Sequence, residues 1–349
     1  MVKQVLVTGA SGYIALHVLD ALLAKGYHVI GTVRSQDKAD KITKQFKAEY
    51  PDAKLDFALV ADIGVEGAFN EVLQQYPEIT DVLHTASPFS FGLNQDLKEA
   101  YLDPATKGTK NALEAIQKFG KNVKHVVVTS SFAAILDVTK KTDPSFVHTE
   151  ETWNPIKWEQ VNNETLAYIA SKKYAEELAQ EYVAENKPSW TLTTVNPGYV
   201  FGPQKFDDVL VNPNLNTSAE IVNKLLKADP SATNAFTEPV GPGVDVRDVA
   251  KLHVVAIEND ELAGKRLIGF ESSFSGQTIL NSIHKHFPEL DGKVAKGQPE
   301  GAQEYADKNS FQVDNSATIK NSGITFTPLD TTFKDSVAQI LNYKKSHPN

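Results

Sequence analysis

The sequence of 349 residues contains no cysteine, so disulfide bridges, cysteine-based zinc sites and thiol catalysis are excluded. Basic residues are in the minority, because 35 Lys and Arg stand against 44 Asp and Glu, which gives a formal net charge of -9. A surface that binds nucleic acid or an anionic membrane would have to be a local basic patch acting against that field, and the sequence shows none. We therefore expect neither nucleic acid nor membrane among the partners.

Long apolar runs are missing as well, and no stretch approaches the length of a membrane span. Residues 1–3 lead straight into the strand-like residues 5–7, without the separate regions of a secretory signal. We expect a cytoplasmic protein with one nucleotide-binding core and a substrate-binding elaboration. The sequence does not choose between a monomer and a homodimer.

The first half of the chain alternates short β-branched runs with longer amphipathic segments. This pattern is typical of an α/β fold with a doubly wound parallel (Rossmann) sheet covered by helices on both faces. Apolar residues at three- and four-residue spacing indicate the helices, and the ligand crevice should lie beyond the carboxyl ends of the strands. Strands are predicted at 4–8, 28–33, 56–60, 81–84, 125–129 and 191–195, and helices at 13–24, 65–75, 104–119 and 165–185.

After residue 195, prolines and glycines interrupt the alternation. We expect residues 1–200 and 244–270 to form the nucleotide-binding domain. Residues 201–243 and 271–349 would form a smaller, mostly helical substrate-binding region. Further helices are predicted at 218–226, 246–258, 277–286 and 332–343, and one more strand at 266–270.

The first predicted strand ends in a Gly-x-x-Gly-x-x-Ala loop that passes directly into a helix. Glycine is needed where the backbone turns sharply and a pyrophosphate must approach without a Cβ in the way, and the helix N-terminus offers unpaired amides to the phosphates. Any tight turn can use two glycines, but the position on the first strand of a β-α series favours a dinucleotide site. The predicted contacts are Gly9, Ala10, Ser11, Gly12, Tyr13 and Ile14.

The end of the second strand indicates which dinucleotide is bound. An acidic residue there would bind the ribose hydroxyls of NAD, whereas this chain has Arg34 and, four residues later, Lys38. The planar guanidinium of Arg34 suits a 2′-phosphate and Lys38 could add a second charge, although both could also be plain surface cations. NADPH is therefore favoured over NADH.

The next two strand ends supply further candidate contacts. Asp62 lies where an acid can accept a hydrogen bond from the adenine amino group, and Ile63 could pack on that ring, although a plain turn Asp fits almost as well. The stretch after the fourth strand would lie beside the ribose and the substrate, because loops at that edge face the crevice. It contributes Thr85 and Ala86 as cofactor contacts and Ser87 as a substrate contact.

Tyr168 and Lys172 lie four residues apart and therefore on one face of a predicted helix. About one such pair is expected by chance, and Tyr50 with Lys54 is such a pair. The position in the fold distinguishes the two pairs. Tyr168 follows the strand that ends in Ser131, and the carboxyl end of that strand lies at the crevice edge of the sheet.

Reduction of a carbonyl by hydride develops negative charge on the oxygen, which then needs a proton donor and a hydrogen-bond donor. Tyr168 would supply the proton and Ser131 would orient the carbonyl. A free phenol has a pKa of about 10, so the nearby Lys172 cation is needed to lower it. We predict a catalytic centre of Ser131, Tyr168 and Lys172 that acts on aldehydes and ketones.

Together these motifs, with Asn196-Pro197 and residues 244–250, resemble the dihydroflavonol-reductase-like branch of extended short-chain dehydrogenases over nearly the whole chain. Within that branch the chain looks most similar to the fungal NADPH-dependent methylglyoxal reductases, also called isovaleraldehyde reductases. The resemblance implies the same triad and a main-chain contact of residues 197–200 with the nicotinamide carboxamide. Gly198 departs from the pattern, which has a bulkier residue there. The resemblance adds Pro197, Val200 and Ser218 as cofactor contacts.

Two other functions remain open. A sugar-nucleotide epimerase or a steroid dehydrogenase would use the same scaffold with NAD, but Arg34 and the apolar residues near the expected pocket oppose it. A dinucleotide-sensing regulator without turnover would not need the Tyr, Lys and Ser set. The apolar residues are Phe89, Phe91, Phe132, Tyr199 and Phe201, of which Phe89, Phe132 and Tyr199 are predicted substrate contacts.

No metal is predicted. His253, His284 and His286 show no metal-ligand spacing with acids, and we interpret them as surface or hydrogen-bonded core residues.

Overall fold

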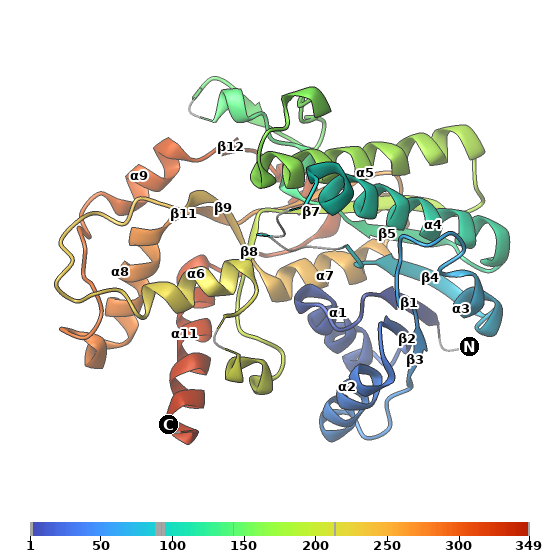
Figure 1. Cartoon of the computed structure of the whole chain (residues 1–349), viewed down its shortest axis with the longest axis horizontal. Coiled ribbons are helices and arrows are strands. Elements are labelled where there is room, and N and C mark those ends of the chain that lie inside the picture. The colour runs from blue at the N-terminus through green and yellow to red at the C-terminus, as the bar shows by residue number, and fades with distance from the viewer. Residues whose placement is uncertain (1–2, 88–91, 93–94, 142, 213, 348–349) are drawn as a thin grey trace.

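The computed structural model describes residues 3–87, 92, 95–141, 143–212 and 214–347. Seven strands, all parallel to their neighbours, form the central sheet in the order β10-β7-β5-β4-β1-β2-β3 (Figure 1). This is the predicted doubly wound sheet, with its strand order reversing between β1 and β4. The strands are β1 (Gln4–Thr8), β2 (His28–Val33), β3 (Leu55–Leu59), β4 (Ile79–His84), β5 (His125–Thr129), β7 (Thr191–Pro197) and β10 (Arg266–Gly269).

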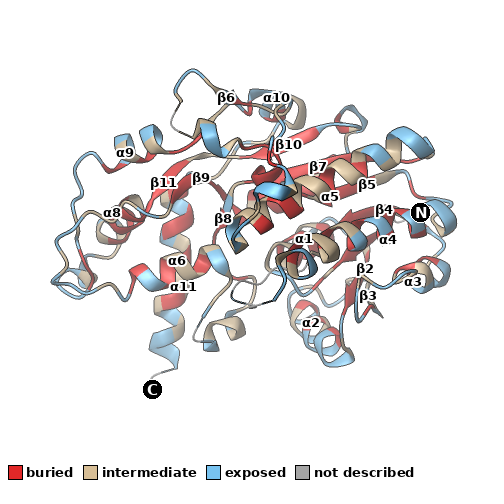
Figure 2. Ribbon diagram, turned by 45° about the horizontal axis from the view of Figure 1, so that its top comes forward, coloured by how far each residue is buried: buried red, intermediate tan, exposed pale blue. Residues whose placement is uncertain are grey.

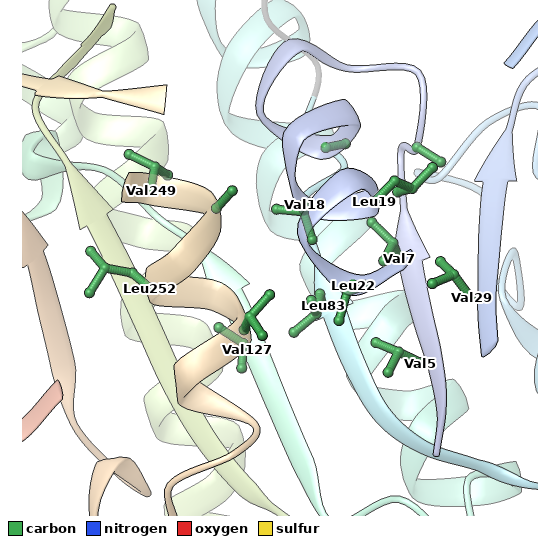
Figure 3. Close-up of a cluster of buried hydrophobic side chains, with 14 of the residues drawn as sticks. Val5, Val7, Val18, Leu19, Leu22, Val29, Leu83, Val127, Val249 and Leu252 are labelled. Atoms are coloured by element: carbon green, nitrogen blue, oxygen red, sulfur yellow. The ribbon is translucent and has the colours of Figure 1, made fainter. Parts of the chain in front are cut away.

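Helices cover both faces of this sheet, so its central strands must be apolar on both sides. Successive side chains of β1 alternate between the faces. Val5 and Val7 belong to the same cluster as Leu19 of α1 (Figure 3). Leu6 belongs to the cluster on the opposite face. One face carries α1 (Tyr13–Ala24), α2 (Gln36–Glu49) and α7 (Val246–Ala256), and the other carries α3 (Asn70–Gln75), α4 (Asp103–Phe119) and α5 (Glu164–Asn186).

A second, smaller layer adjoins this unit, and Figure 2 shows its buried interior beside that of the main sheet. Phe201, Phe274 and Phe333 are almost fully buried there and pack edge to face. Its strands are β8 (Tyr199–Phe201), β9 (Val240–Asp245) and β11 (Ser272–Ser275), in the order β11-β9-β8. The helices in the second half of the chain are α6 (Thr217–Leu225), α8 (Gly276–His286), α9 (Ala302–Asn309), α10 (Ser316–Ser322) and α11 (Leu329–Ser346).

The remaining elements are short. A two-stranded sheet pairs β6 (Val147–His148) with β12 (Gln312–Val313). A π-helical turn covers Lys98–Leu102, and 3₁₀ turns cover Phe132–Ala134, Val138–Lys140, Trp158–Gln160, Asp207–Val211, Asp260–Leu262 and Pro288–Leu290. None of the helices described has an apolar stretch long enough to cross a membrane.

The predicted elements of the main sheet and its helices match the structure apart from their ends, with two larger differences and one omission. The helix predicted at 65–75 begins only at Asn70, because Gly67 adopts a φ of +76° that an α-helix does not contain. The strand predicted at 56–60 lies one residue earlier. Helix α2 was not predicted at all, although Ala39, Ile42 and Phe46 are spaced to bury one face.

Candidate active site

The predicted crevice begins at the reversal of strand order, where β1 and β4 are neighbours. Gly9 follows β1 with a φ of +66°, and a Cβ there would lie 2.8 Å from the Cα of Ala86. A side chain at position 9 would therefore push apart the loops that follow the two strands. Gly12 is the N-cap of α1 and no side chain caps the helix, which leaves its first amides free for an anion.

The other residues of the glycine loop are held by contacts with neighbouring parts of the fold, apart from the exposed Ser11. The amide of Ala10, which is fully buried, donates to the Thr32 carbonyl at 2.8 Å, whereas Ser11 is exposed. The Tyr13 hydroxyl donates to the Gly202 carbonyl at 2.8 Å, and Ile14 packs against the core beneath α1. Tyr13 thus ties the predicted cofactor loop to the segment after β8.

Arg34 and Lys38 flank the start of α2 and are both exposed. Within the part of the chain that the structure describes, neither side chain makes a hydrogen bond or an ion pair. Two unpaired cations beside the glycine loop fit the 2′-phosphate of NADPH.

The predicted adenine contacts follow β3. The Asp62 carboxylate is exposed and accepts from the Gly64 amide at 2.8 Å, which is an ordinary turn bond. Ile63 packs against Gly108 of α4. A Cβ added at Gly108 would lie 2.7 Å from the Cδ1 atom of Ile63. The bond from the Asn111 amide to the Ile63 carbonyl at 2.8 Å holds it there.

The stretch after β4 is fixed to β1 by hydroxyl groups. Thr85 donates through its hydroxyl to the Thr8 carbonyl, and the Ala86 amide donates to the Thr8 hydroxyl at 3.1 Å. The Ser87 hydroxyl accepts from Nζ of Lys172 at 3.1 Å. Phe89 and Phe91 lie outside the described residues.

Ser131, Tyr168 and Lys172 come together at the carboxyl ends of β4 and β5. Ser131 caps the 3₁₀ turn after β5, where its hydroxyl accepts from the Ala133 amide at 3.1 Å, and its side chain is also hydrogen bonded to Tyr168. Asn163 caps α5 by accepting from the Leu166 amide at 2.9 Å, which places Tyr168 and Lys172 on successive turns. Nζ of Lys172 lies 6.0 Å from the Tyr168 ring centre.

Burial shifts both groups toward their neutral forms. It raises the pKa of Tyr168, against the opposing effect of the hydrogen bond with Ser131, so the side chain is a neutral phenol that can donate a proton. Burial lowers the pKa of Lys172 to about 8, against the attraction of Glu176. The neighbouring imidazole of His84 is neutral, because burial lowers its pKa to about 4.

The segment that follows β7 is tightly packed. Pro197 and Val200 are buried, and Ser218 is half-buried near the start of α6. A Cβ at Gly198 would collide with the Pro242 carbonyl oxygen, so this glycine lets the chain pack against β9.

The two remaining predicted substrate residues have different surroundings. Tyr199 is 37% exposed, and its ring packs on Gly241. A Cβ added at Gly241 would lie 3.0 Å from the Cε2 atom of Tyr199. Its hydroxyl is close enough to Tyr168 to influence the pKa of that group. Phe132 is 3% exposed and packs edge to face on Phe311 and His148, so its contact with a substrate stays a prediction.

Of the three histidines considered in the sequence, His253 is buried and hydrogen bonded on both nitrogens. Nε2 of His253 lies 2.6 Å from the Thr129 hydroxyl and Nδ1 lies 2.8 Å from the Val249 carbonyl. His284 and His286 each contact a carboxylate on the surface. The described residues contain no group of three or more His, Asp or Glu that could hold a metal ion.

Sequence reasoning missed one charged residue of this region. Glu176 lies on α5 four residues after Lys172 and is 1% exposed. The signal was present, because the spacing that joins Tyr168 to Lys172 continues for one more turn.

Comparison with known proteins identifies the family of the chain. Residues 5–268 match the model of the "NAD dependent epimerase/dehydratase family". The NADPH-dependent methylglyoxal reductase of Saccharomyces cerevisiae is 41% identical over 346 residues, which cover 98% of this chain and 99% of that protein.

Solved structures show the same likeness. The crystal structure of the yeast methylglyoxal/isovaleraldehyde reductase complexed with NADPH has a TM-score of 0.92 and 40% identity, and covers 98% of this chain and 99% of that one. The NADPH complex of the related protein from Candida albicans has a TM-score of 0.92 and 39% identity, with the same coverage of 98% and 99%.

Proposed function

Because the chain belongs to the NAD-dependent epimerase/dehydratase family, we propose from its site that it is an NADPH-dependent carbonyl reductase. It converts aldehydes and ketones, including 2-oxoaldehydes such as methylglyoxal, to alcohols. The observation that carries this proposal is the arrangement of Tyr168, Ser131 and Lys172 at the crevice, in a chain about 40% identical to NADPH-dependent reductases.

Each part of the site has a role in the proposed reaction. NADPH supplies the hydride. The Tyr168 phenol donates the proton to the carbonyl oxygen, and the Ser131 hydroxyl orients that oxygen and stabilises its developing charge. The ammonium of Lys172 favours the phenolate that proton donation leaves behind.

The residues present fit this cofactor. The bare turn at Gly9 and Gly12 leaves room for a pyrophosphate at the uncapped start of α1, and Arg34 with Lys38 would hold the 2′-phosphate. Asp62 and Ile63 would contact the adenine, and Lys172 with Tyr168 would hold the nicotinamide ribose. The remaining proposed contacts are Ala10, Ser11, Tyr13, Ile14, Thr85, Ala86, Pro197, Val200 and Ser218.

We further propose that residues 1–200 and 244–270 bind the nucleotide and that residues 201–243 and 271–349 bind the substrate. Strand β10 supports this division, because it pairs with β7 of the main sheet, whereas β11 pairs with β9 of the small one. A cytoplasmic location and a monomeric or homodimeric state belong to the same proposal.

A panel of aldehydes, 2-oxoaldehydes and ketones tests the function directly. We expect purified protein to oxidise NADPH in the presence of at least one of them, with NADH a poorer donor, as followed by the loss of absorbance of the reduced cofactor. Binding of NADPH without turnover across the whole panel would favour a dinucleotide-sensing regulator.

Replacement of Tyr199 by Ala is expected to change which carbonyl compounds are accepted. Its exposed ring stands on β8 near Tyr168, so truncation enlarges the space beside the reacting oxygen. The ratio of kcat/KM for a bulky ketone to that for a small aldehyde should rise about tenfold, the order expected for a change in pocket contacts.

Cofactor titration distinguishes this effect from general damage. The Kd of NADPH should stay near that of the wild type. Phe132→Ala tests the other predicted substrate contact, and because its ring is buried the change should also lower the free energy of unfolding by about 3–5 kcal/mol. An unchanged substrate ranking with Tyr199→Ala would show that its ring does not contact the substrate.

A further inference from the structure

Glu176 is a buried carboxylate that the proposed proton donation does not use directly. It lies four residues after Lys172 and eight after Tyr168, so the three side chains share one face of α5. Burial of a charged carboxylate is strongly unfavourable unless partners compensate it. The groups that compensate the charge of Glu176 therefore show which parts of the fold this carboxylate holds together.

Four side chains donate hydrogen bonds to Glu176. Nε of Arg266 donates to Oε1 at 2.6 Å, and the Thr194 hydroxyl donates to the same oxygen at 3.3 Å. Nδ2 of Asn196 donates to Oε2 at 2.6 Å, and the Ser130 hydroxyl also donates to Oε2. The carboxylate is thus held in one position between α5 and the strands β5, β7 and β10.

Arg266 extends this network toward the turn that Ser131 caps. Its guanidinium donates to the carbonyls of Thr152 at 2.5 Å, Glu150 at 3.0 Å and Ala134 at 3.3 Å. It also lies 4.0 Å from the ring centre of Trp153. The buried ion pair therefore fixes α5 against the loop at 150–153 and the 3₁₀ turn.

Two connections lead from Glu176 into the catalytic centre. Asn196, which donates to Glu176, also donates to the Ser131 carbonyl at 3.2 Å, so the backbone of the catalytic serine is held through it. Lys172 and Glu176 line the same small pocket, and the carboxylate attracts the ammonium.

We propose that Glu176 is a positioning residue of the catalytic centre, whose buried negative charge keeps Lys172 in its ammonium form and whose hydrogen bonds orient Ser131. This inference rests on the proposed function, because it assigns Glu176 a part in the same proton donation. It names no direct contact of Glu176 with substrate or cofactor.

The surroundings of Lys172 determine the sign of the effect. It is faced by Tyr168 and Glu176 from α5, by the neutral His84 at the end of β4 and by the Ser87 hydroxyl. Among these described neighbours only Glu176 is negative. Removal of a negative charge makes proton loss easier and therefore lowers the pKa of both Lys172 and Tyr168. Reduction needs both groups protonated. The pH above which activity is lost must therefore fall, whichever of the two groups loses its proton there.

Glu176→Gln keeps the shape of the side chain and removes its charge. In the full-length protein, the alkaline limb of the profile of kcat/KM against pH, for NADPH and one good aldehyde, should move to lower pH by about one unit. At neutral pH kcat should fall about tenfold, within the range that proton donors contribute. Glu176→Asp retains the charge and should keep the limb close to its wild-type position.

A double variant covers the risk that Arg266 is left as an uncompensated buried cation. Glu176→Gln with Arg266→Met removes both charges of the pair, a change that buried ion pairs often tolerate. Its alkaline limb should also move to lower pH, because Glu176 is the partner whose charge acts on Lys172.

Asp81→Asn is the matched control. Asp81 is another fully buried carboxylate, bonded to Nδ1 of His125 at 2.6 Å and to the Thr80 hydroxyl at 2.7 Å, but it pairs with the first residue of β5, away from the crevice. This variant is expected to lose stability without moving the limb. A profile for Glu176→Gln that overlays the wild type, or an equal shift for Asp81→Asn, overturns the proposal. A wild type that reduces no carbonyl overturns the proposed function instead.

Discussion

Replacement of Tyr168 by Phe is expected to lower kcat for carbonyl reduction by about 10²- to 10⁴-fold, the contribution typical of a positioned proton donor. The change retains the ring and removes only the hydroxyl that bonds Ser131. NADPH should still bind, because the glycine loop and Arg34 are untouched. Steady-state oxidation of NADPH with one good aldehyde, paired with titration of the cofactor, measures both quantities.

Lys172→Met should lower kcat to a similar extent, because it removes the cation that favours the phenolate. It should also weaken NADPH binding if the ammonium holds the nicotinamide ribose. Tyr50→Phe is the control for the tyrosine: its hydroxyl donates to Asp20 at 2.7 Å at the far end of α2, and it should leave kcat unchanged. Near-normal turnover by the Tyr168→Phe protein would contradict the mechanism and favour the regulator.

The proposed catalytic residues could be predicted from the sequence because two general rules bring them together. Four-residue spacing puts Tyr168 and Lys172 on one helical face, and parallel strands bring their carboxyl ends, with Ser131, to one edge of the sheet. The first rule is local, and the second follows from the predicted fold class alone. The structure confirms the sheet and shows the three side chains together.

Other features depend on contacts between distant residues and could not be predicted in this way. Glu176 and Arg266 are 90 residues apart, so nothing local shows that they form an ion pair. The small sheet was missed because β9 contains Gly241, Pro242 and Gly243, which normally interrupt a strand. Gly198 departs from the pattern of the resembled branch, and its close approach to Pro242 is visible only in the structure.

Cofactor preference offers the second large effect. Arg34→Asp should raise the Kd of NADPH about 10- to 150-fold, because it removes charge-assisted hydrogen bonds worth about 1.5–3 kcal/mol. It also places a carboxylate beside the 2′-phosphate, whereas the same carboxylate can accept hydrogen bonds from the ribose hydroxyls of NADH. The ratio of kcat/KM with NADPH to that with NADH should therefore fall, and NADH should become the comparable or better donor.

The matched control for this reversal is Lys47→Asp, which makes the same change in net charge on the exposed last turn of α2. Long-range attraction of an anionic cofactor would weaken equally in both variants and would be screened by salt, whereas a direct bond between Arg34 and the 2′-phosphate is lost only in the first. We therefore expect the preference to change with Arg34→Asp alone, at both low and high ionic strength. Equal changes in the two variants, or an unaltered preference with Arg34→Asp, would remove Arg34 from the cofactor site and reopen the choice between NADPH and NADH.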